Sequence, residues 1–346
     1  MDRVKEFLRK KDVVISRQRY LYGALSAMAN AVFATLVIGL ILNTMGQQLQ
    51  DVLGENPALS LFTYMGQLAM EFKGPAIGVA VAMALKSPDL VVFSSAVTGA
   101  AGAAAGGEVA ALIAAVVGAE AGKLISKETK IDILLTPGVT LVAGGTAAAV
   151  TGPAAHALMT GIGMLIQTGT EMEPLLMGIV VSVAVGMVLT SPLSSAAVCI
   201  MLELDGLAAG AALIGCCAQM VGFAATSFRD CGMGGVVAIG LGTTKFQLPN
   251  ILRNPWLLLP PVVASAIIGP LGTCVFHMVT IKEGAGMGTC GLAGQIFTFT
   301  EMGVSAETVA AVALLHFVLP VVLSLIFDWV LRKMGKIKDG DYYLDL

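Results

Sequence analysis

Long apolar stretches separated by short polar segments run through almost the whole chain. A helix that crosses a bilayer needs about 20 predominantly apolar residues, and stretches near that length recur along the sequence. We therefore expect an all-α, polytopic membrane protein with about ten transmembrane helices. The predicted ranges are 20–44, 62–85, 90–106, 109–125, a helix within 133–167, a helix through 182–192, 193–202, 207–227, 255–279 and 306–331.

One apolar stretch occurs twice. Residues 78–88 read GVAVAMALKSP and residues 182–192 read SVAVGMVLTSP, with seven of eleven positions identical at an offset of 104. Each copy ends in Ser-Pro, and proline both disfavours helical geometry in the preceding residue and removes a backbone donor. Matched helix breaks in two halves of a membrane protein indicate a transport site. Because the copies lie four predicted crossings apart, we expect an internal parallel duplication.

The duplication suggests how a single membrane domain over residues 1–346 is divided. We expect a first repeat at 20–130, a second repeat at 131–230, C-terminal helices and re-entrant segments at 231–331, and a cytoplasmic tail at 332–346. Two Gly-rich polar segments, 230–254 and 284–295, are the predicted re-entrant elements, since irregular backbone at membrane depth must line water or protein.

Composition supports a membrane protein and leaves no sizeable soluble domain. Of the 346 residues, 56% are hydrophobic and 12% are charged, whereas soluble domains carry roughly a quarter charged residues. The 41 glycines include GxxxG spacings at 102–106, 118–122 and 206–210. This spacing favours helices whose backbones approach closely.

The basic residues are concentrated at the two ends of the chain. Seven precede the first apolar stretch and four follow the last: Arg3, Lys5, Arg9, Lys10, Lys11, Arg17 and Arg19, then Arg332, Lys333, Lys336 and Lys338. By the positive-inside rule both termini are expected in the cytoplasm. The first stretch is too long for a signal peptide and is interpreted as a retained helix. The amphipathic segment before it is expected to lie along the inner membrane surface.

Several motifs in the second half of the chain resemble one family. They are LTSPLSSAA (189–197), GCCAQMVGFA (215–224), SFR (227–229), GLGT (240–243), PNILRNP (249–255) and GMGT (286–289), the last followed by Gly294-Gln295. The sequence resembles the EIIC-like membrane family of the phosphotransferase system, in its perfringolysin-regulator-like branch. The resemblance covers nearly the whole chain.

The resemblance implies a sugar permease subunit that works as a homodimer in the bacterial cytoplasmic (inner) membrane, by alternating access. In that system a separate EIIB protein, charged from phosphoenolpyruvate through soluble carriers such as EIIA, phosphorylates the sugar held by EIIC. The sequence has no appended EIIA or EIIB domain. It also lacks a clear Gly-Ile-Thr-Glu-Pro motif, whose glutamate binds sugar in glucose-type permeases; residues 169–174 and 300–302 match it only loosely. Whether the subunit takes part in a phosphotransferase reaction is therefore left open.

Two other functions stay open from the residues alone. A secondary transporter would move a polar small molecule without modifying it, and an acidic residue whose protonation couples to uptake would favour that function. A membrane sensor or regulator would bind a ligand and signal through a docking partner. A channel is disfavoured because no ring of charges or filter-like motif is visible.

Four candidate substrate-binding residues belong to the second predicted repeat. Glu171 precedes the second copy, Ser194 and Ser195 follow its proline, and Gln219 lies in the apolar stretch 207–227. Their polar groups suit the hydroxyls of a sugar. Each also has a structural interpretation: a solvated loop charge for Glu171, support of a broken helix for the serines, and interhelical hydrogen bonding for Gln219.

Five further candidates lie in or before the two predicted re-entrant segments. Arg229 ends the stretch before the first segment and could attract a phosphate, although positive-inside anchoring explains it equally well. Gln247 and Asn250 belong to the first segment, and Thr289 and Gln295 belong to the second. All five are candidate substrate-binding residues.

We expect no catalytic residue, no metal, no cofactor and no nucleic-acid partner. The six cysteines have no CxxC or Cys/His metal spacing. Residues 286–291 fit GxGxxG, but no βαβ unit surrounds them, so dinucleotide binding is not expected. His316 is the best ionisable candidate of three isolated histidines, and packing with one hydrogen bond is the favoured interpretation for it.

Overall fold

The computed structural model describes residues 2–14, 16–54 and 56–344; residues 345 and 346 of the expected tail lie outside the described part. It is 83% helical, and over the described ranges the only ladder pairing is an isolated bridge between Gly206 and Thr280. Six of its helices are long and apolar enough to cross a membrane. The prediction of an all-α polytopic membrane protein is confirmed. Contacts divide the chain into unit 1 (Met1–Leu158) and unit 2 (Met159–Leu346).

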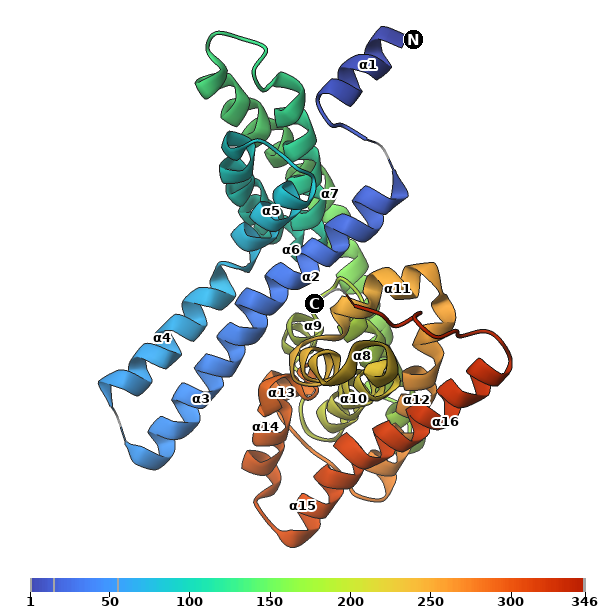
Figure 1. Ribbon diagram of the computed structural model, residues 1–346. Coiled ribbons are helices and arrows are strands. Elements are labelled where there is room, and N and C mark those ends of the chain that lie inside the picture. Colours follow the sequence, from blue (N-terminus) through green and yellow to red (C-terminus); the bar gives the residue numbers. More distant parts are fainter. Residues whose placement is uncertain (1, 15, 55, 345–346) are drawn as a thin grey trace. The chain divides into compact units, whose positions relative to one another are not determined.

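Unit 1 begins with a short helix and a long helical rod. Its elements are α1 (Asp2–Lys10), η1 (Gln18–Gly23), α2 (Ala24–Val32), η2 (Phe33–Val37), α3 (Ile38–Leu53), α4 (Pro57–Glu71), α5 (Lys73–Ala84), α6 (Asp89–Ile125) and most of α7 (Asp132–Thr170). The pieces from η1 to α3 follow one another without a gap, and α4 packs beside α3 (Figure 1). The helix predicted at 20–44 is therefore longer than expected.

The helix predicted at 62–85 is two helices in the structure. α4 ends at Glu71 and α5 begins at Lys73, with Phe72 between them at φ −81° and ψ 7°. Pro75 lies in the first turn of α5. Because proline has no N–H and its ring crowds the carbonyl four residues before it, it cannot continue the hydrogen-bond ladder from α4.

The helices predicted at 90–106 and 109–125 are the two arms of a hairpin within α6. The chain reverses at Gly107, whose φ of +70° is a conformation that glycine adopts without strain. The arms meet backbone to backbone, since a Cβ on Gly102 would lie 2.5 Å from the carbonyl oxygen of Ala110. At 1.5 Å per residue each arm is about 27 Å long, close to the thickness of a bilayer core.

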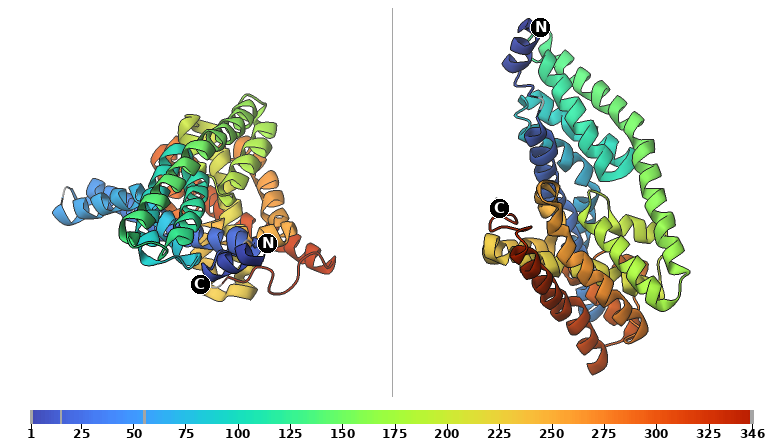
Figure 2. Two further views of the ribbon diagram at one scale, coloured as in Figure 1. Left: turned by 90° about the horizontal axis from the view of Figure 1, so that it is seen from above. Right: turned by 90° about the vertical axis from the view of Figure 1, so that its right-hand side faces the viewer.

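α7 runs without interruption from Asp132 to Thr170, although it contains Pro137 and Pro153 (Figure 2). The helix predicted within 133–167 is thus longer than expected, and Gly152-Pro153 does not end it. Gly152 lies directly against the backbone of Ala105, where an added Cβ would come within 2.8 Å of the carbonyl oxygen. Close packing against a neighbouring helix is a setting in which membrane helices tolerate proline.

Unit 2 combines four long helices with several short ones. Its elements after α7 are α8 (Pro174–Thr190), α9 (Ser195–Met201), α10 (Gly206–Val237), η3 (Ala238–Gly242), η4 (Thr244–Gln247), α11 (Leu248–Arg253), η5 (Pro255–Leu258), α12 (Leu259–Cys274), α13 (Lys282–Ala285), η6 (Cys290–Leu292), α14 (Ala293–Met302), α15 (Ala306–Val312), η7 (Ala313–Val318) and α16 (Leu319–Lys333). Of the short pieces, η3, η4 and α11 lie within 230–254 and η6 lies within 284–295, the two segments that the sequence predicts to be irregular.

α10 is the central helix of unit 2. Every residue from 209 to 224 is buried, and α8, α12 and α16 pack around it. A helix that is apolar on all sides belongs in the interior of a bundle. Its backbone touches that of α8 directly, since a Cβ on Gly215 would lie 1.9 Å from the carbonyl oxygen of Ser182. The helix bends back at Gly232, where φ is +61°.

We expect Gly215→Ala to destabilise the protein by about 2 kcal/mol or more, because the added methyl group collides with backbone that cannot yield as a side chain would. Gly161→Ala in α7 is the control, since no atom lies within 4 Å of its Cβ position. That change should be neutral or stabilise by up to about 1 kcal/mol. Thermal unfolding of the two purified variants in detergent measures the difference, and equal unfolding temperatures would contradict the packing described here.

Candidate functional site

The second Ser-Pro break lies between α8 and α9. Ser191 stabilises it locally: its Oγ donates to the carbonyl of Val188 (2.7 Å) and accepts from the N–H of Leu193 (3.1 Å). Ser194 caps α9, since its Oγ accepts from the N–H of Ala197 (3.3 Å). A serine at this position satisfies an N–H that the helix leaves free. Ser194 therefore supports the break, as one of its two predicted interpretations requires.

Three separate segments bind the loop of the break. From α10, Gln219 accepts a hydrogen bond from the Thr190 hydroxyl (3.1 Å). From η4, the Lys245 Nζ donates to the carbonyl of Leu193 (2.7 Å). The Ser195 hydroxyl donates to the carbonyl of Gly286, which follows α13 (2.7 Å). We call this region the break site and define it by Thr190, Ser195, Gln219, Lys245 and the backbone of residues 190–195.

The break site is closed to solvent. Its four side chains belong to residues that are at most 5% exposed, and Gln219 is fully buried. Among them only Lys245 is ionisable, and no carboxylate belongs to the site. The arrangement offers hydroxyl and amide groups, which both donate and accept hydrogen bonds.

Gln219 has an amide that the structure leaves partly unpaired. Its Oε1 accepts from Thr190, whereas its Nε2 finds no partner among the described residues. Oxygen and nitrogen of such an amide can be exchanged when hydrogen bonds are assigned. With the exchange the amide nitrogen would donate to the threonine hydroxyl and the oxygen would be unpaired instead. An unpaired buried polar atom costs about 1–3 kcal/mol.

The GMGT motif packs onto both α9 and α10. A Cβ on Gly286 would lie 2.6 Å from the N atom of Ala196, and one on Gly288 would lie 2.8 Å from the Sδ of Met220. Gly288 also has φ +58°. Glycine is required there for both conformation and space. Thr289 is buried and its hydroxyl donates to the carbonyl of Gly240, so this threonine ties the motif to η3.

A second buried polar cluster lies on another face of α10. The Gln295 amide donates to the Sγ of Cys217 (3.3 Å) and lies 3.2 Å from the Nδ1 of His316. The Oε1 of Gln295 and the Nε2 of His316 find no partner within the described ranges. Cys217 and Gln219 are two residues apart, about 200° around the helix, so this cluster and the break site lie on different sides of α10.

Gln247 and Asn250 hold the C-terminal tail. The Gln247 Nε2 donates to the Ser227 hydroxyl and to the Tyr342 carbonyl (2.9 Å each). The Asn250 Nδ2 donates to the Gln247 Oε1 and to the Tyr343 carbonyl (2.9 Å each). In this structure the donor groups of both predicted residues are therefore occupied by the chain itself.

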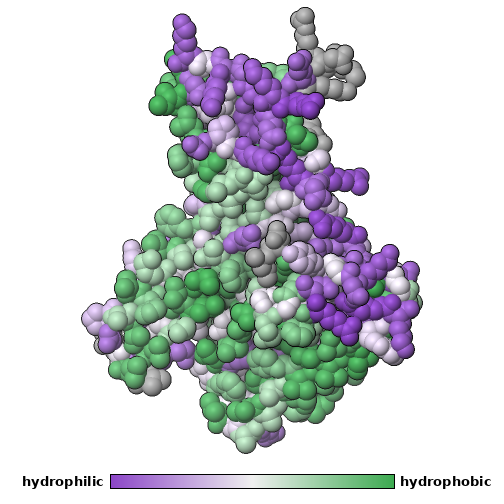
Figure 3. Space-filling model, viewed as in Figure 1, coloured by the Kyte–Doolittle hydropathy of each residue, from purple (hydrophilic) through white to green (hydrophobic). Residues whose placement is uncertain are grey.

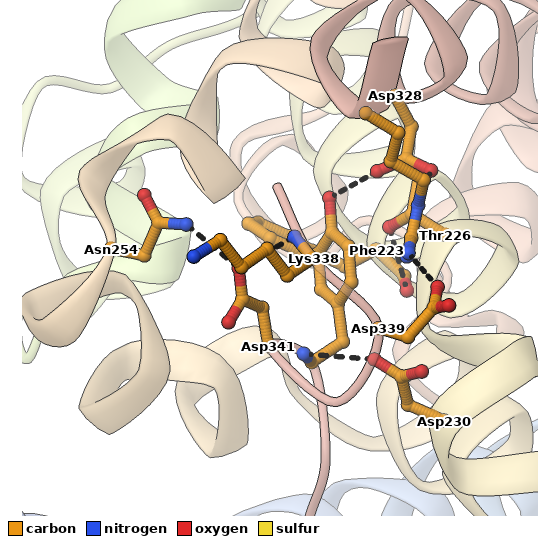
Figure 4. A network of polar contacts seen from close by, with 10 residues as sticks. Phe223, Thr226, Asp230, Asn254, Asp328, Lys338, Asp339 and Asp341 are labelled. Atoms are coloured by element: carbon orange, nitrogen blue, oxygen red, sulfur yellow. Dashed lines mark hydrogen bonds and ion pairs between the residues drawn. The ribbon is translucent and has the colours of Figure 1, made fainter. Parts of the chain in front are cut away.

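Tyr342 anchors the tail (Figure 4). Its hydroxyl donates to Asp328 (2.9 Å) and its N–H donates to Asp230 (3.0 Å). Asp328 also accepts from Arg332 (2.7 Å), and the Tyr342 ring packs edge-on against Phe223. Burial, reinforced by the nearby Asp328 carboxylate, raises the pKa of Tyr342.

Two predicted residues lie at exposed positions. Glu171 is in the turn between α7 and α8, and Arg229 is near the end of the straight part of α10. Neither side chain contributes a hydrogen bond to the break site as described. The structure thus brings Ser195 and Gln219 to one site, places Gln295 in the second cluster, and separates Glu171 and Arg229 from both.

Comparison with known proteins decides the family. Residues 22–344 match the family described as "Phosphotransferase system, EIIC". The chain belongs to this EIIC family. No curated protein and no solved structure matches it at a significant level. As an EIIC, the protein is a multi-pass membrane permease subunit of a sugar phosphotransferase system, in which EIIA and EIIB proteins are the general partners.

Sequence reasoning about this EIIC missed two features of the site. Lys245 is not among the predicted site residues, although a cation inside a Gly-rich irregular segment is itself a signal of a structural role. The tail contacts of Gln247 and Asn250 span more than 90 residues of sequence, and no local pattern indicates them. Over the described residues no group of His, Cys, Asp and Glu could hold a metal ion.

Tyr342→Phe should loosen the tail by about 1–3 kcal/mol, because it removes a buried hydrogen bond to a charged carboxylate. We expect trypsin to cleave after Lys336 and Lys338 about tenfold faster, since cleavage of a transiently open segment follows the open population. Tyr343→Phe is the matched control, because the Tyr343 side chain is exposed. Equal cleavage rates for the two variants would show that the Tyr342 hydroxyl does not hold the tail.

The tail should also respond to high pH. Because the pKa of Tyr342 is raised in the folded state, its contribution to docking is fully present below the ordinary tyrosine pKa of about 10 and is lost as the pH rises further. In a spectroscopic titration, Tyr342→Phe should leave the phenolate signal around pH 10 unchanged and should remove a signal only at higher pH. A Tyr342 signal at pH 10 would contradict this.

Proposed function

We propose that this EIIC binds its sugar at the break site of unit 2. The observation that carries the proposal is the fully buried Gln219 amide, which keeps an unpaired polar atom beside a broken helix. Discontinuous helices in membrane transporters place freed backbone groups at the substrate. A sugar hydroxyl would supply the partner that the amide lacks, because it can both donate and accept.

The chemistry of the break site favours an uncharged solute. Thr190, Ser195 and Gln219 are neutral hydrogen-bonding groups, and the ammonium of Lys245 is directed at the backbone of Leu193. We therefore assign Lys245 to holding the break rather than to the sugar. Thr289 positions the GMGT motif behind the site, and Gln295 with His316 forms a second polar group that we propose as a further contact along the solute's path.

The buried state of the site requires movement for access. We propose alternating access, in which the loop at residues 190–195 changes its hydrogen-bond partners while the solute enters or leaves. Three hydrogen bonds to other segments hold it in the present arrangement: from Thr190 to Gln219, from Lys245 to the Leu193 carbonyl and from Ser195 to the Gly286 carbonyl. Of the other predicted residues, Glu171 and Arg229 would meet a solute outside the buried site, and Gln247 and Asn250 would do so after release of the tail.

The assembly and surroundings of the protein follow from the same proposal. We propose a homodimer in the bacterial cytoplasmic membrane, with both termini in the cytoplasm, a parallel repeat at 20–130 and 131–230, and a separate EIIB as phosphoryl donor. The excess of basic residues at both ends supports this orientation. The tail site at Tyr342 would then face the cytoplasm.

Uptake of a labelled sugar panel into membrane vesicles tests the coupling. With internal phosphoenolpyruvate and the host's soluble carriers, we expect sugar phosphate to accumulate, and without either one we expect none. Unmodified solute whose uptake is abolished by a proton uncoupler would indicate a secondary transporter. Binding of a sugar without any uptake would indicate a sensor.

Gln219→Leu tests the site. We expect affinity for the transported sugar to fall about 10- to 100-fold, because about 1–3 kcal/mol of hydrogen bonding is lost. We also expect the unfolding temperature to stay close to that of wild type, because removal of an unpaired buried polar atom offsets the loss of the bond to Thr190. Met220→Leu, at the next buried position of α10, is the control. A fall in stability with unchanged sugar affinity would mean that Gln219 is an interhelical hydrogen-bonding residue instead.

A further inference from the structure

Unit 1 contains a polar cavity that the transport mechanism does not use. It has a volume of about 440 Å³ and lies where the loops before η1, after α5 and after α6 come together. Five lysines line it: Lys10, Lys11, Lys86, Lys123 and Lys127. We call it the lysine pocket. Its lining also includes the carboxylates Asp12 and Glu128.

Two of the five lysines are structural. Lys123 is buried, and its Nζ pairs with Glu120 (3.1 Å) and donates to the carbonyls of Asp12 (2.8 Å) and Leu85 (3.0 Å). Lys11 forms an ion pair with Glu128 and donates to the carbonyl of Ser126. These contacts build the wall of the pocket.

The carboxylates of the pocket are already engaged. Asp12 pairs with Arg19 at 2.5 Å, and this hydrogen bond lowers the pKa of the aspartate. Glu128 is held by Lys11, whose hydrogen bond lowers the pKa of the glutamate. Both acids therefore stay ionised and paired with Arg19 and Lys11.

Three lysines keep their charge unpaired. Lys10, Lys86 and Lys127 are exposed, and their side chains form no ion pair within the described ranges. The lining residues and their bonded partners Arg19, Glu120 and Asp132 comprise six cations and four carboxylates, a net charge of +2. Like charges that converge on one cavity attract an anion.

The backbone holds these lysines in place. Lys86 has φ +56° and Lys127 has φ +62°, which is an uncommon conformation for residues other than glycine. Asp12, in the same wall, has φ +53°. Such conformations persist only where the surrounding contacts fix them. The backbone that carries the two lysine side chains is thus fixed by its surroundings.

The pocket lies at one end of the apolar helices of unit 1. It is at the end of unit 1 where α5 and both arms of α6 terminate and where η1 begins, and Figure 3 shows hydrophilic residues gathered there, at the top of the view, above the apolar surface of the helices. Phe7 of α1 is 38% exposed beside it, with the Lys11 ammonium 5.7 Å from its ring centre. Basic clusters next to a transmembrane helix bind anionic lipids.

We propose that the lysine pocket binds a phosphate group, with Lys10, Lys86 and Lys127 as its cationic contacts, and that the source is the headgroup of an anionic phospholipid. Free inorganic phosphate has the same chemistry and is the other source to distinguish. The position beside the amphipathic α1 and its exposed Phe7 favours the lipid, whose acyl chains would lie along the apolar helices below.

Native mass spectrometry of the full-length protein in detergent tests the proposal. Wild type should retain phosphatidylglycerol in preference to phosphatidylcholine. The double variant Lys86→Gln, Lys127→Gln should bind phosphatidylglycerol about tenfold more weakly. The double variant Lys130→Gln, Lys338→Gln loses the same charge at exposed positions outside the pocket and should match wild type. Unfolding temperatures of the three proteins confirm that each is folded.

Competition with inorganic phosphate in the same experiment identifies the source of the bound phosphate group. If millimolar inorganic phosphate displaces phosphatidylglycerol from wild type but not from the pocket variant, the pocket takes phosphate of either origin. If phosphate has no effect, the lipid is the ligand. Equal retention of the two lipids, or equal binding by the pocket variant and the control variant, would overturn the proposal.

Discussion

A helix that ends leaves backbone carbonyls without a partner in their own helix, and both Ser-Pro breaks of the chain have to satisfy such groups. In unit 1 the Lys123 Nζ reaches the carbonyl of Leu85 (3.0 Å). In unit 2 the Lys245 Nζ reaches the carbonyl of Leu193 (2.7 Å). Each lysine comes from a segment more than 35 residues away, at sequence separations of 38 and 52. The two halves thus satisfy the same kind of broken helix with the same kind of group.

The two copies differ where their sequences differ. Lys86 leaves the helix with φ +56° and points its charge into an open, polar cavity. Thr190, at the equivalent position, is still helical, and its short hydroxyl side chain bonds to Gln219 inside the bundle. A lysine could not lie at position 190 without burying an extra charge beside Lys245. One copy of the motif therefore produces an exposed cationic break, and the other produces a buried neutral one, which fits the two different ligands that we propose.

The sequence predicted those parts of the structure that depend on neighbouring residues. Proline after serine located both breaks, and Gly106-Gly107 separated the two arms of α6. Gln219 was predicted as a site residue because it is polar and lies in an apolar stretch. What the sequence could not predict depends on distant contacts. The continuity of α7 through Pro153 depends on how the helix packs against its neighbours, whereas the split at Phe72 follows from Pro75 and could have been predicted. The role of Gln247 depends on Tyr342, 95 residues away.

The unpaired amide of Gln219 can be compared with the other buried polar groups of unit 2. Some buried polar groups between its helices are satisfied: the Ser182 hydroxyl donates to the carbonyl of Ser265 (2.9 Å), and the Thr273 hydroxyl donates to that of Pro174 (2.7 Å). Others, among them the Gln295 Oε1 and the His316 Nε2 of the second cluster, find no partner among the described residues, as is also true of the Gln219 Nε2. These hydroxyls also sit where glycines bring backbones together, so their role in packing is clear. Gln219 needs only its Oε1 to accept from Thr190, and its fully buried Nε2 finds no partner among the described residues. A residue that is more polar than its packing needs, at the end of a broken helix in a permease subunit, is best explained by a ligand that completes its hydrogen bonds.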